Sequence, residues 1–366
     1  MARRVSNPPN PWTSTHVEWL GEAPRVELDV YEEQAKSILT QNESPDVPFR
    51  YGVNAYRGCQ HACAYCYARP THQYLGFGAG TDFDTRIVAK TNAAELLEKA
   101  IARRGWERWP INFSGVTDAY QPLEASYRLT RACLEVCARY HNPVAVVTKG
   151  ALVRRDAELL AKIEERARVP RGSSTQRAQG TEGAQATPRP GAEVYVSIPF
   201  ARDEVGRSIE PLAAAPSMRF ETLRALSEAG VPTGVALAPI IPGLNDADIP
   251  EILTRAHEAG ARRAFLILLR LPAEVEAVFR ERLEAAFPLR ADRVWSALAE
   301  MRGGTVKDSS FGSRMEGQGP RWETIRRLFE VHCRRLGYEL RVRESEHPLG
   351  PRGALQGQLF PDENPS

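Results

Sequence analysis

Six short apolar segments alternate with helical patterns through the middle of the chain, and this alternation limits the folds that the chain can adopt. The segments are rich in Val, Ile, Phe and Tyr, and Gly, Pro or Asn residues bound them, as is typical of strands. They are residues 50–56, 111–114, 144–148, 193–198, 233–238 and 264–269. Strands that alternate with helices form βαβ units, so the pattern predicts a parallel α/β sheet, either a barrel or a doubly wound layer.

Helical patterns lie between these strands and after them. Asn92, with Glu95 three residues later, predicts a helix start, and Gly230 and Gly260 predict helix ends. The patterns cover residues 93–104, 124–140, 156–166, 218–229, 247–259, 292–301 and 320–336.

The same patterns divide the chain into a core and flanking segments. Residues 50–272 form the expected core. Within it, residues 169–192 hold no aromatic residue and little that is apolar beyond alanine, which predicts a flexible insertion. We expect an N-terminal arm over residues 1–49, a C-terminal helical extension over 273–345 and a flexible tail over 346–366.

Composition narrows the class of protein. The chain has 366 residues, of which 42% are hydrophobic and 26% charged, as in ordinary globular proteins. No apolar run approaches the roughly 20 residues that cross a bilayer, and the first residues carry no apolar signal segment. We therefore expect a cytoplasmic protein without a membrane partner. The net charge of +2 gives no strong overall attraction to nucleic acid or anionic membranes.

Three of the six cysteines fall within eight residues. Cys59, Cys63 and Cys66 have the spacing CxxxCxxC and follow the first predicted strand. Three thiolates on one short loop suit a site for a soft metal. A structural zinc site would need a fourth ligand, for which His61 or His72 is available. An iron–sulfur cube held by three cysteines would instead keep one iron open for an external ligand.

The other three cysteines, Cys133, Cys137 and Cys333, lie on predicted helices beside apolar residues. Buried packing is the interpretation that we adopt for them. The clustered cysteines differ, because they lie on a loop after a strand, where parallel barrels carry their active sites.

CxxxCxxC with Tyr65 before the third cysteine resembles the signature of the radical SAM superfamily, and residues 51–272 resemble its core, a partial (β/α)6 barrel of the TIM type. The resemblance implies a [4Fe-4S] cluster on the three cysteines, whose open iron binds S-adenosyl-L-methionine (SAM). Reductive cleavage of SAM would release a 5′-deoxyadenosyl radical that abstracts hydrogen from a substrate. An external electron donor of the flavodoxin or ferredoxin type would supply the electron.

The residues around the motif narrow the resemblance to one branch of the superfamily. Residues 54–58, 67–72 and 114–122 look like the spore photoproduct lyase-like branch, whose members are often labelled DNA repair photolyases. This implies damaged DNA as a substrate. True spore photoproduct lyase carries, in the stretch that matches residues 113–118, a cysteine that returns hydrogen to the product radical, and here that stretch holds none. The specific photoproduct reaction is therefore in doubt.

The resemblance also implies residues that bind SAM. Thr117 and Asp118 stand where related enzymes contact the methionyl amine. Lys149 resembles a lysine near the methionyl carboxylate, and Ser197 resembles a hydroxyl on the ribose side; Tyr65 belongs to the same candidate set. Each has a structural alternative: Thr117 as a turn residue, Lys149 as a solvated lysine and Ser197 as a barrel filler.

Two other functions remain open. The first is radical modification of a protein or a small molecule, since a fold does not fix its substrate. The second is a nucleic-acid-binding module with a structural zinc or cluster. Near the C-terminus, Gln356, Leu359 and Phe360 resemble the peptide by which bacterial repair proteins bind the replication sliding clamp.

Overall fold

The main sheet has seven strands in the order β10-β9-β8-β7-β6-β3-β2. The structure is a computed structural model and describes residues 28–44, 46–47, 49–167, 190–304, 306 and 314–339. The strand bounds are β2 Leu39–Gln41, β3 Tyr51–Val53, β6 Ile111–Phe113, β7 Val144–Thr148, β8 Ala192–Ser197, β9 Thr233–Ile240 and β10 Arg263–Leu268. Neighbours from β3 through β10 follow chain order and are parallel, whereas β2 is antiparallel at the edge. The predicted partial (β/α)6 barrel is confirmed.

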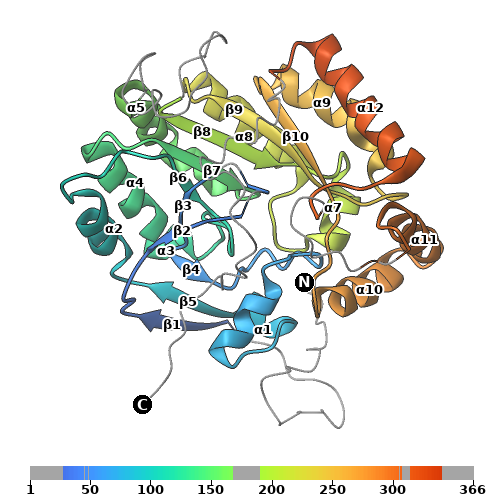
Figure 1. Cartoon of the computed structure of the whole chain (residues 1–366), viewed down its shortest axis with the longest axis horizontal. Helices are drawn as coiled ribbons and strands as arrows, with labels where there is room; N and C mark the ends of the chain where they lie inside the picture. The colour runs from blue at the N-terminus through green and yellow to red at the C-terminus, as the bar shows by residue number, and fades with distance from the viewer. Residues whose placement is uncertain are drawn as a thin grey trace, which may run out of the picture.

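Helices connect the parallel strands and cover the outer face of the sheet (Figure 1). The apolar faces of the longer helices turn inward, so Leu97, Leu134, Leu160 and Leu253 are fully buried. The connecting helices are α2 Ala93–Ile101, α3 Glu124–Tyr127, α4 Leu129–Arg139, η2 Ala151–Asp156, α5 Ala157–Ala167, α7 Asp203–Ile209, α8 Pro216–Glu228, η3 Asp246–Asp248 and α9 Ile249–Glu258.

The helix predicted over residues 124–140 is broken in two at Arg128, which has a φ of 54°. The carboxylate of Glu124 explains the break. It accepts hydrogen bonds from the backbone N–H groups of Thr130 (3.0 Å) and Arg131 (3.1 Å), and so satisfies the first turn of α4. The apolar periodicity runs through both helices, so it could not show this tertiary cap.

The first predicted strand, residues 50–56, is also divided between two sheets. Its start is β3, and its end leads into β4 (Tyr56–Arg57), which belongs to a second sheet in the order β1-β5-β4. In that sheet β1 (Asp29–Glu33) is parallel to β5 (Arg86–Lys90), and β4 is antiparallel to it. The division matters because β4 leads directly into the cysteines.

Asn92 precedes α2, as predicted, but its side chain makes no capping hydrogen bond. Its amide instead bonds both the N–H and the C=O of Ala35, each at 2.9 Å. Asn92 therefore ties the segment after β1 to the barrel. Gly230 and Gly260 end α8 and α9 with positive φ angles of 80° and 98°, as predicted.

Three further helices follow the barrel: α10 (Val275–Ala286), α11 (Ala291–Met301) and α12 (Gly319–Leu336). α12 packs against α9 beside β10 (Figure 1). The hydroxyl of Tyr338 donates to the carbonyl of Leu253 at 2.7 Å, and Cys333 is buried in this contact region, as predicted.

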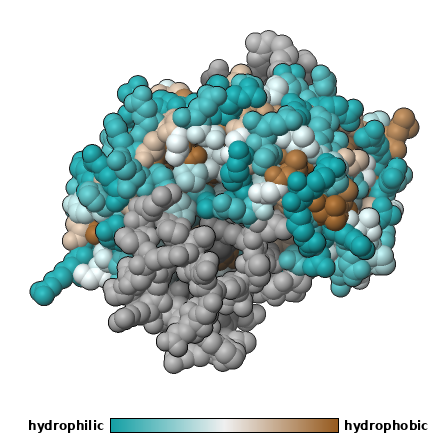
Figure 2. All heavy atoms as spheres, turned by 90° about the horizontal axis from the view of Figure 1, so that it is seen from above, coloured by the Kyte–Doolittle hydropathy of each residue, from teal (hydrophilic) through white to brown (hydrophobic). Residues whose placement is uncertain are grey.

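Two predicted segments lie largely outside the described residues: most of the insertion at 169–192, and the tail at 346–366 with Gln356, Leu359 and Phe360. Among the described residues, no helix is both long and apolar enough to cross a membrane. The face drawn in Figure 2 is mostly hydrophilic, with hydrophobic side chains in small separate groups.

Candidate active site

The cysteine loop, residues 58–66, runs from β4 to the short helix η1 (Arg69–Leu75). Cys59 and Cys63 are buried, and Cys66 is half-buried. The N–H of Cys59 donates to the carbonyl of Phe83 in α1 (Thr81–Thr85) at 2.9 Å, and the N–H of Cys66 donates to the carbonyl of Cys63 at 3.2 Å. All six cysteines are free thiols, and the three outside the loop are buried on α4 and α12.

Arg69 is fully buried and makes hydrogen bonds to the backbone of this loop. Its Nε and Nη2 donate to the carbonyl of Cys63 at 3.1 and 2.9 Å, and Nη2 also reaches both carboxylate oxygens of Asp84, at 2.9 and 3.2 Å. Its Nη1 donates to the carbonyls of Ala79 and Gly80. One guanidinium therefore fixes the backbone at the middle cysteine, a role that the sequence analysis did not find.

Thr117 lies in the loop after β6 and contacts the cysteine loop. Its hydroxyl donates to the carbonyl of Gly58 at 2.6 Å and accepts a hydrogen bond from Nε2 of Gln121 at 3.1 Å. Oε1 of Gln121 accepts the N–H of Gln60 at 3.0 Å, and Oε1 of Gln60 accepts the N–H of Leu123 at 2.7 Å. These bonds set the loop after β6 in a fixed position against the cysteines.

The carboxylate of Asp118 is bound by groups of the protein itself. It accepts hydrogen bonds from the hydroxyl of Thr148 (2.5 Å) and the N–H groups of Lys149 (2.8 Å) and Tyr120 (2.9 Å), and lies 3.3 Å from Nδ1 of His61. Burial favours the neutral carboxyl, but His61 and these donors together hold its pKa well below the usual range. Asp118 therefore joins β7, the loop after β6 and the cysteine loop.

Three of the predicted site residues, Lys149, Ser197 and Tyr65, lie together in the structure. Nζ of Lys149, just after β7, donates to Oγ of Ser197 at the end of β8 (3.0 Å). The same Nζ lies 5.5 Å from the ring centroid of Tyr65 on the cysteine loop. Oγ of Ser197 donates to the carbonyl of Ala238 on β9 at 3.1 Å. These side chains meet at the carboxyl ends of adjacent strands.

The sequence analysis missed two charged residues that lie beside this group. Glu210, which follows α7, and Arg219 on α8 are each 1% exposed and form an ion pair. Glu210 also accepts the hydroxyl of Tyr65 and lies 3.9 Å from Nζ of Lys149. Charged residues on connecting helices are common at the surface, so no sequence signal marked this pair as buried.

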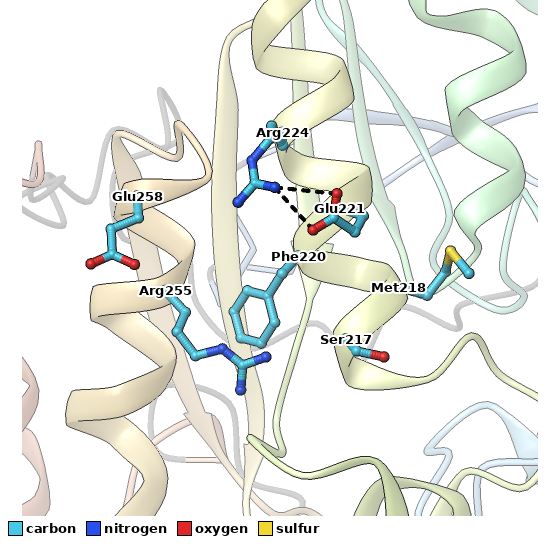
Figure 3. A pocket seen from close by; sticks show the side chains of 7 residues that line it. All are labelled: Ser217, Met218, Phe220, Glu221, Arg224, Arg255 and Glu258. Carbon is cyan, nitrogen blue, oxygen red and sulfur yellow. Dashed lines mark hydrogen bonds and ion pairs between the residues drawn. The ribbon is translucent and has the colours of Figure 1, made fainter.

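A surface pocket of about 290 Å³ lies elsewhere, between α8 and α9 (Figure 3). Arg224 donates to both carboxylate oxygens of Glu221, and the guanidinium of Arg255 lies 4.0 Å from the ring centroid of Phe220. None of the predicted site residues lines this pocket.

The sequence is 35% identical to the uncharacterized protein Rv2578c of Mycobacterium tuberculosis over 266 residues, which is 71% of each chain. The chain belongs to the family of that protein. It is also 26% identical to the uncharacterized protein MJ0683 of Methanocaldococcus jannaschii over 221 residues, 60% of this chain and 71% of that protein. No protein-family model matches the sequence.

Among solved structures, the chain is similar to spore photoproduct lyase complexed with dinucleoside spore photoproduct. The TM-score is 0.55 at 15% sequence identity, and the match covers 85% of this chain and 81% of that one. A mutant of the same enzyme matches with a TM-score of 0.54 over 89% of this chain and 87% of its own. The predicted resemblance to the spore photoproduct lyase-like branch of the radical SAM superfamily is confirmed at the level of the fold.

The chemistry of the cysteine loop fits an iron–sulfur cluster. Burial raises the pKa of the thiols of Cys59, Cys63 and Cys66, so three thiolates here need a compensating positive charge such as bound iron supplies. The loop offers three thiols and the remaining cysteines lie on α4 and α12, which suits a cluster with one iron left open.

The two histidines considered for a zinc site have other partners. Nδ1 of His61 faces Asp118, and Nε2 of His72 lies 2.8 Å from the carbonyl of Arg86. Over the described ranges, no group of three or more His, Cys, Asp or Glu side chains, the three loop cysteines included, is arranged to hold a metal ion, so the fit of the loop to a cluster rests on its residue types and burial.

Proposed function

We propose that this protein is a radical SAM enzyme. The observation that carries the proposal is that Lys149 and Ser197, at the carboxyl ends of the parallel strands β7 and β8, lie beside Tyr65 of the loop that holds the three cysteines. A [4Fe-4S] cluster on Cys59, Cys63 and Cys66 would supply the electron that cleaves SAM to a 5′-deoxyadenosyl radical, which abstracts hydrogen from the substrate.

The side chains around the loop have separate parts in this proposal. The ammonium of Lys149 would bind the carboxylate of SAM, and Ser197 would orient the ribose. Thr117, whose hydroxyl contacts the cysteine loop at Gly58, would contact the methionyl amine. The contacts of Asp118 favour a positioning role, because its carboxylate already accepts three hydrogen bonds inside the protein. Burial of this site would keep water away from a radical.

For the substrate we propose damaged nucleic acid, supported by the fold shared with spore photoproduct lyase. Residues 113–118 hold no cysteine, so the proposal does not extend to the photoproduct reaction itself. We also propose an electron donor of the flavodoxin or ferredoxin type. The cytoplasmic location and the clamp-binding peptide stay predictions.

Anaerobic reconstitution with iron and sulfide tests the chemistry. We expect about four irons per chain and, with dithionite and SAM, formation of 5′-deoxyadenosine. Cys63→Ala should lose both, whereas Cys133→Ala, which removes a buried thiol on α4, should keep both. Colourless protein that binds zinc instead of iron would contradict the proposal.

A second experiment addresses the substrate class. The reconstituted enzyme is incubated with irradiated or intact DNA, and both crosslinking and 5′-deoxyadenosine are measured. We expect irradiated DNA to increase both. If the two DNAs behave alike while 5′-deoxyadenosine still forms, the substrate is a protein or a small molecule and the nucleic-acid proposal fails.

A further inference from the structure

A buried cluster of charges lies directly beside the cysteine loop, and we call it the Glu210 cluster: Tyr65, Lys149, Glu210 and Arg219. The Glu210 side chain has no exposed surface. Its Oε1 accepts the hydroxyl of Tyr65 and lies 3.9 Å from Nζ of Lys149, and its Oε2 accepts Nη2 of Arg219. One carboxylate therefore faces two cations and one phenol.

Arg219 fixes the position of this carboxylate. Its Nη1 donates to the carbonyl of Ser197 at 2.9 Å, and its Nε donates to the carbonyl of Ala214 at 2.6 Å. The guanidinium thus uses all three of its nitrogens inside the protein. The Glu210 cluster is attached to the end of β8, to α8 and, through Lys149, to the end of β7.

The Glu210 cluster is also tied to the cysteine loop through the backbone. The N–H of Ala64 donates to the carbonyl of Ile209 at 3.0 Å, and the N–H of Leu212 donates to the carbonyl of His61 at 3.3 Å. These bonds hold the segment around Glu210 against the loop on both sides of Cys63. Tyr65, whose hydroxyl Glu210 accepts, is itself a residue of the cysteine loop, so the charges of the Glu210 cluster lie close to Cys63.

We infer that the Glu210 cluster sets the electrostatic potential at the cysteine loop, and so the reduction potential of the iron–sulfur cluster bound there. The inference rests on the proposed function. Reduction adds one negative charge, which nearby cations stabilise and nearby anions disfavour. Because Glu210 and Arg219 are shielded from solvent and Lys149 is mostly so, their charges are screened far less than surface charges. Burying an ion pair also costs desolvation, so packing alone gives little reason for it.

The test is a redox titration of the reconstituted, SAM-free protein, followed by electron paramagnetic resonance. Glu210→Gln keeps an acceptor for Tyr65 but removes the negative charge, so we expect a higher reduction potential than in the wild type. Lys149→Gln removes a positive charge, so we expect a lower one. Opposite shifts are the signature of an electrostatic role, because loss of packing would not give them opposite signs.

The chain offers a matched control in Glu193, near the start of β8. It is 4% exposed, accepts the hydroxyl of Tyr195 at 2.9 Å and pairs with Arg263 at 2.7 Å. It lies four residues before Ser197, about 13 Å along the strand. Glu193→Gln should therefore leave the reduction potential unchanged.

Three outcomes overturn the inference: unchanged potentials in both variants, shifts of the same sign, or an equal shift in Glu193→Gln. If thermal unfolding shows that Glu210→Gln does not fold, Lys149→Gln decides alone, because the Lys149 side chain is partly exposed. An unchanged reduction potential in Lys149→Gln then contradicts the inference.

A wild-type protein that holds an iron–sulfur cluster but forms no 5′-deoxyadenosine refutes the proposed function, while the titrations still decide the role of Glu210. A wild-type protein without a cluster refutes both.

Discussion

Gly58, the residue before the first cysteine of the loop, has a φ of +79°, in the left-handed region. A Cβ atom here would lie 2.9 Å from both Cδ1 of Ile87 and the carbonyl oxygen of Phe83. The close approach lets the cysteine loop lie against β5 and α1. The carbonyl of Gly58 accepts a hydrogen bond from the hydroxyl of Thr117, so this residue joins the cysteine loop to the loop after β6.

Gly58→Ala should therefore lower the free energy of unfolding by about 2–4 kcal/mol, because it adds left-handed strain to a clash with backbone. Denaturant unfolding measures the change. The control is Gly76→Ala, where φ is +76° but nothing lies within 4 Å of the new Cβ. That variant should lose about 1–2 kcal/mol. Equal losses in the two variants would contradict a role for close packing.

Between elements, the histidine of η1 links the segment after the cysteines to the second sheet. His72 is buried, its Nε2 lies 2.8 Å from the carbonyl of Arg86, and its ring packs near Phe77 and Phe83. Burial lowers its pKa from 6.5 to about 4. The folded protein thus holds the neutral ring, and the unfolded chain takes up a proton first as the pH falls.

The free energy of unfolding is therefore highest above pH 6.5, where His72 is neutral in both states. It decreases as the pH falls toward 4, because the unfolded chain binds the proton and the folded protein does not. We expect the contribution of His72 to the free energy of unfolding to be about 2 kcal/mol smaller at pH 5 than at pH 7.5. His72→Gln should flatten the dependence between these values, measured by denaturant unfolding at each pH. A variant with the slope of the wild type would show that other groups titrate there.

At the scale of the whole molecule, one buried arginine joins the C-terminal helices to the barrel. Arg302, at the end of α11, donates to the carbonyl of Leu269 just after β10 at 2.8 Å. It also donates to the carbonyls of Arg314 (3.1 Å) and Glu316 (2.9 Å), which precede α12. The extension and the barrel are therefore expected to unfold together.

Arg302→Leu should reduce the free energy of unfolding by about 2–4 kcal/mol, because it leaves three carbonyls without this donor. Arg321→Leu is the control, since its ion pair with Glu300 at 2.9 Å is exposed and such pairs contribute about 0–1 kcal/mol. Thermal or denaturant unfolding measures both. Two separate transitions in the wild type would contradict a single cooperative unit.

The sequence by itself determined the six parallel strands and the position of the cysteines, because short apolar segments bounded by Gly, Pro or Asn and the spacing of the cysteines are local properties of the chain. The strand predicted at residues 144–148 agrees with β7 residue for residue. Tertiary structure decided what depends on partners distant in sequence: the cap that Glu124 gives to α4, the attachment of Asn92 to Ala35, and the burial of Glu210 with Arg219. A charged residue on a helix or just after one has the same local pattern whether it faces water or a buried partner, so only the folded arrangement could place that pair beside the cysteine loop.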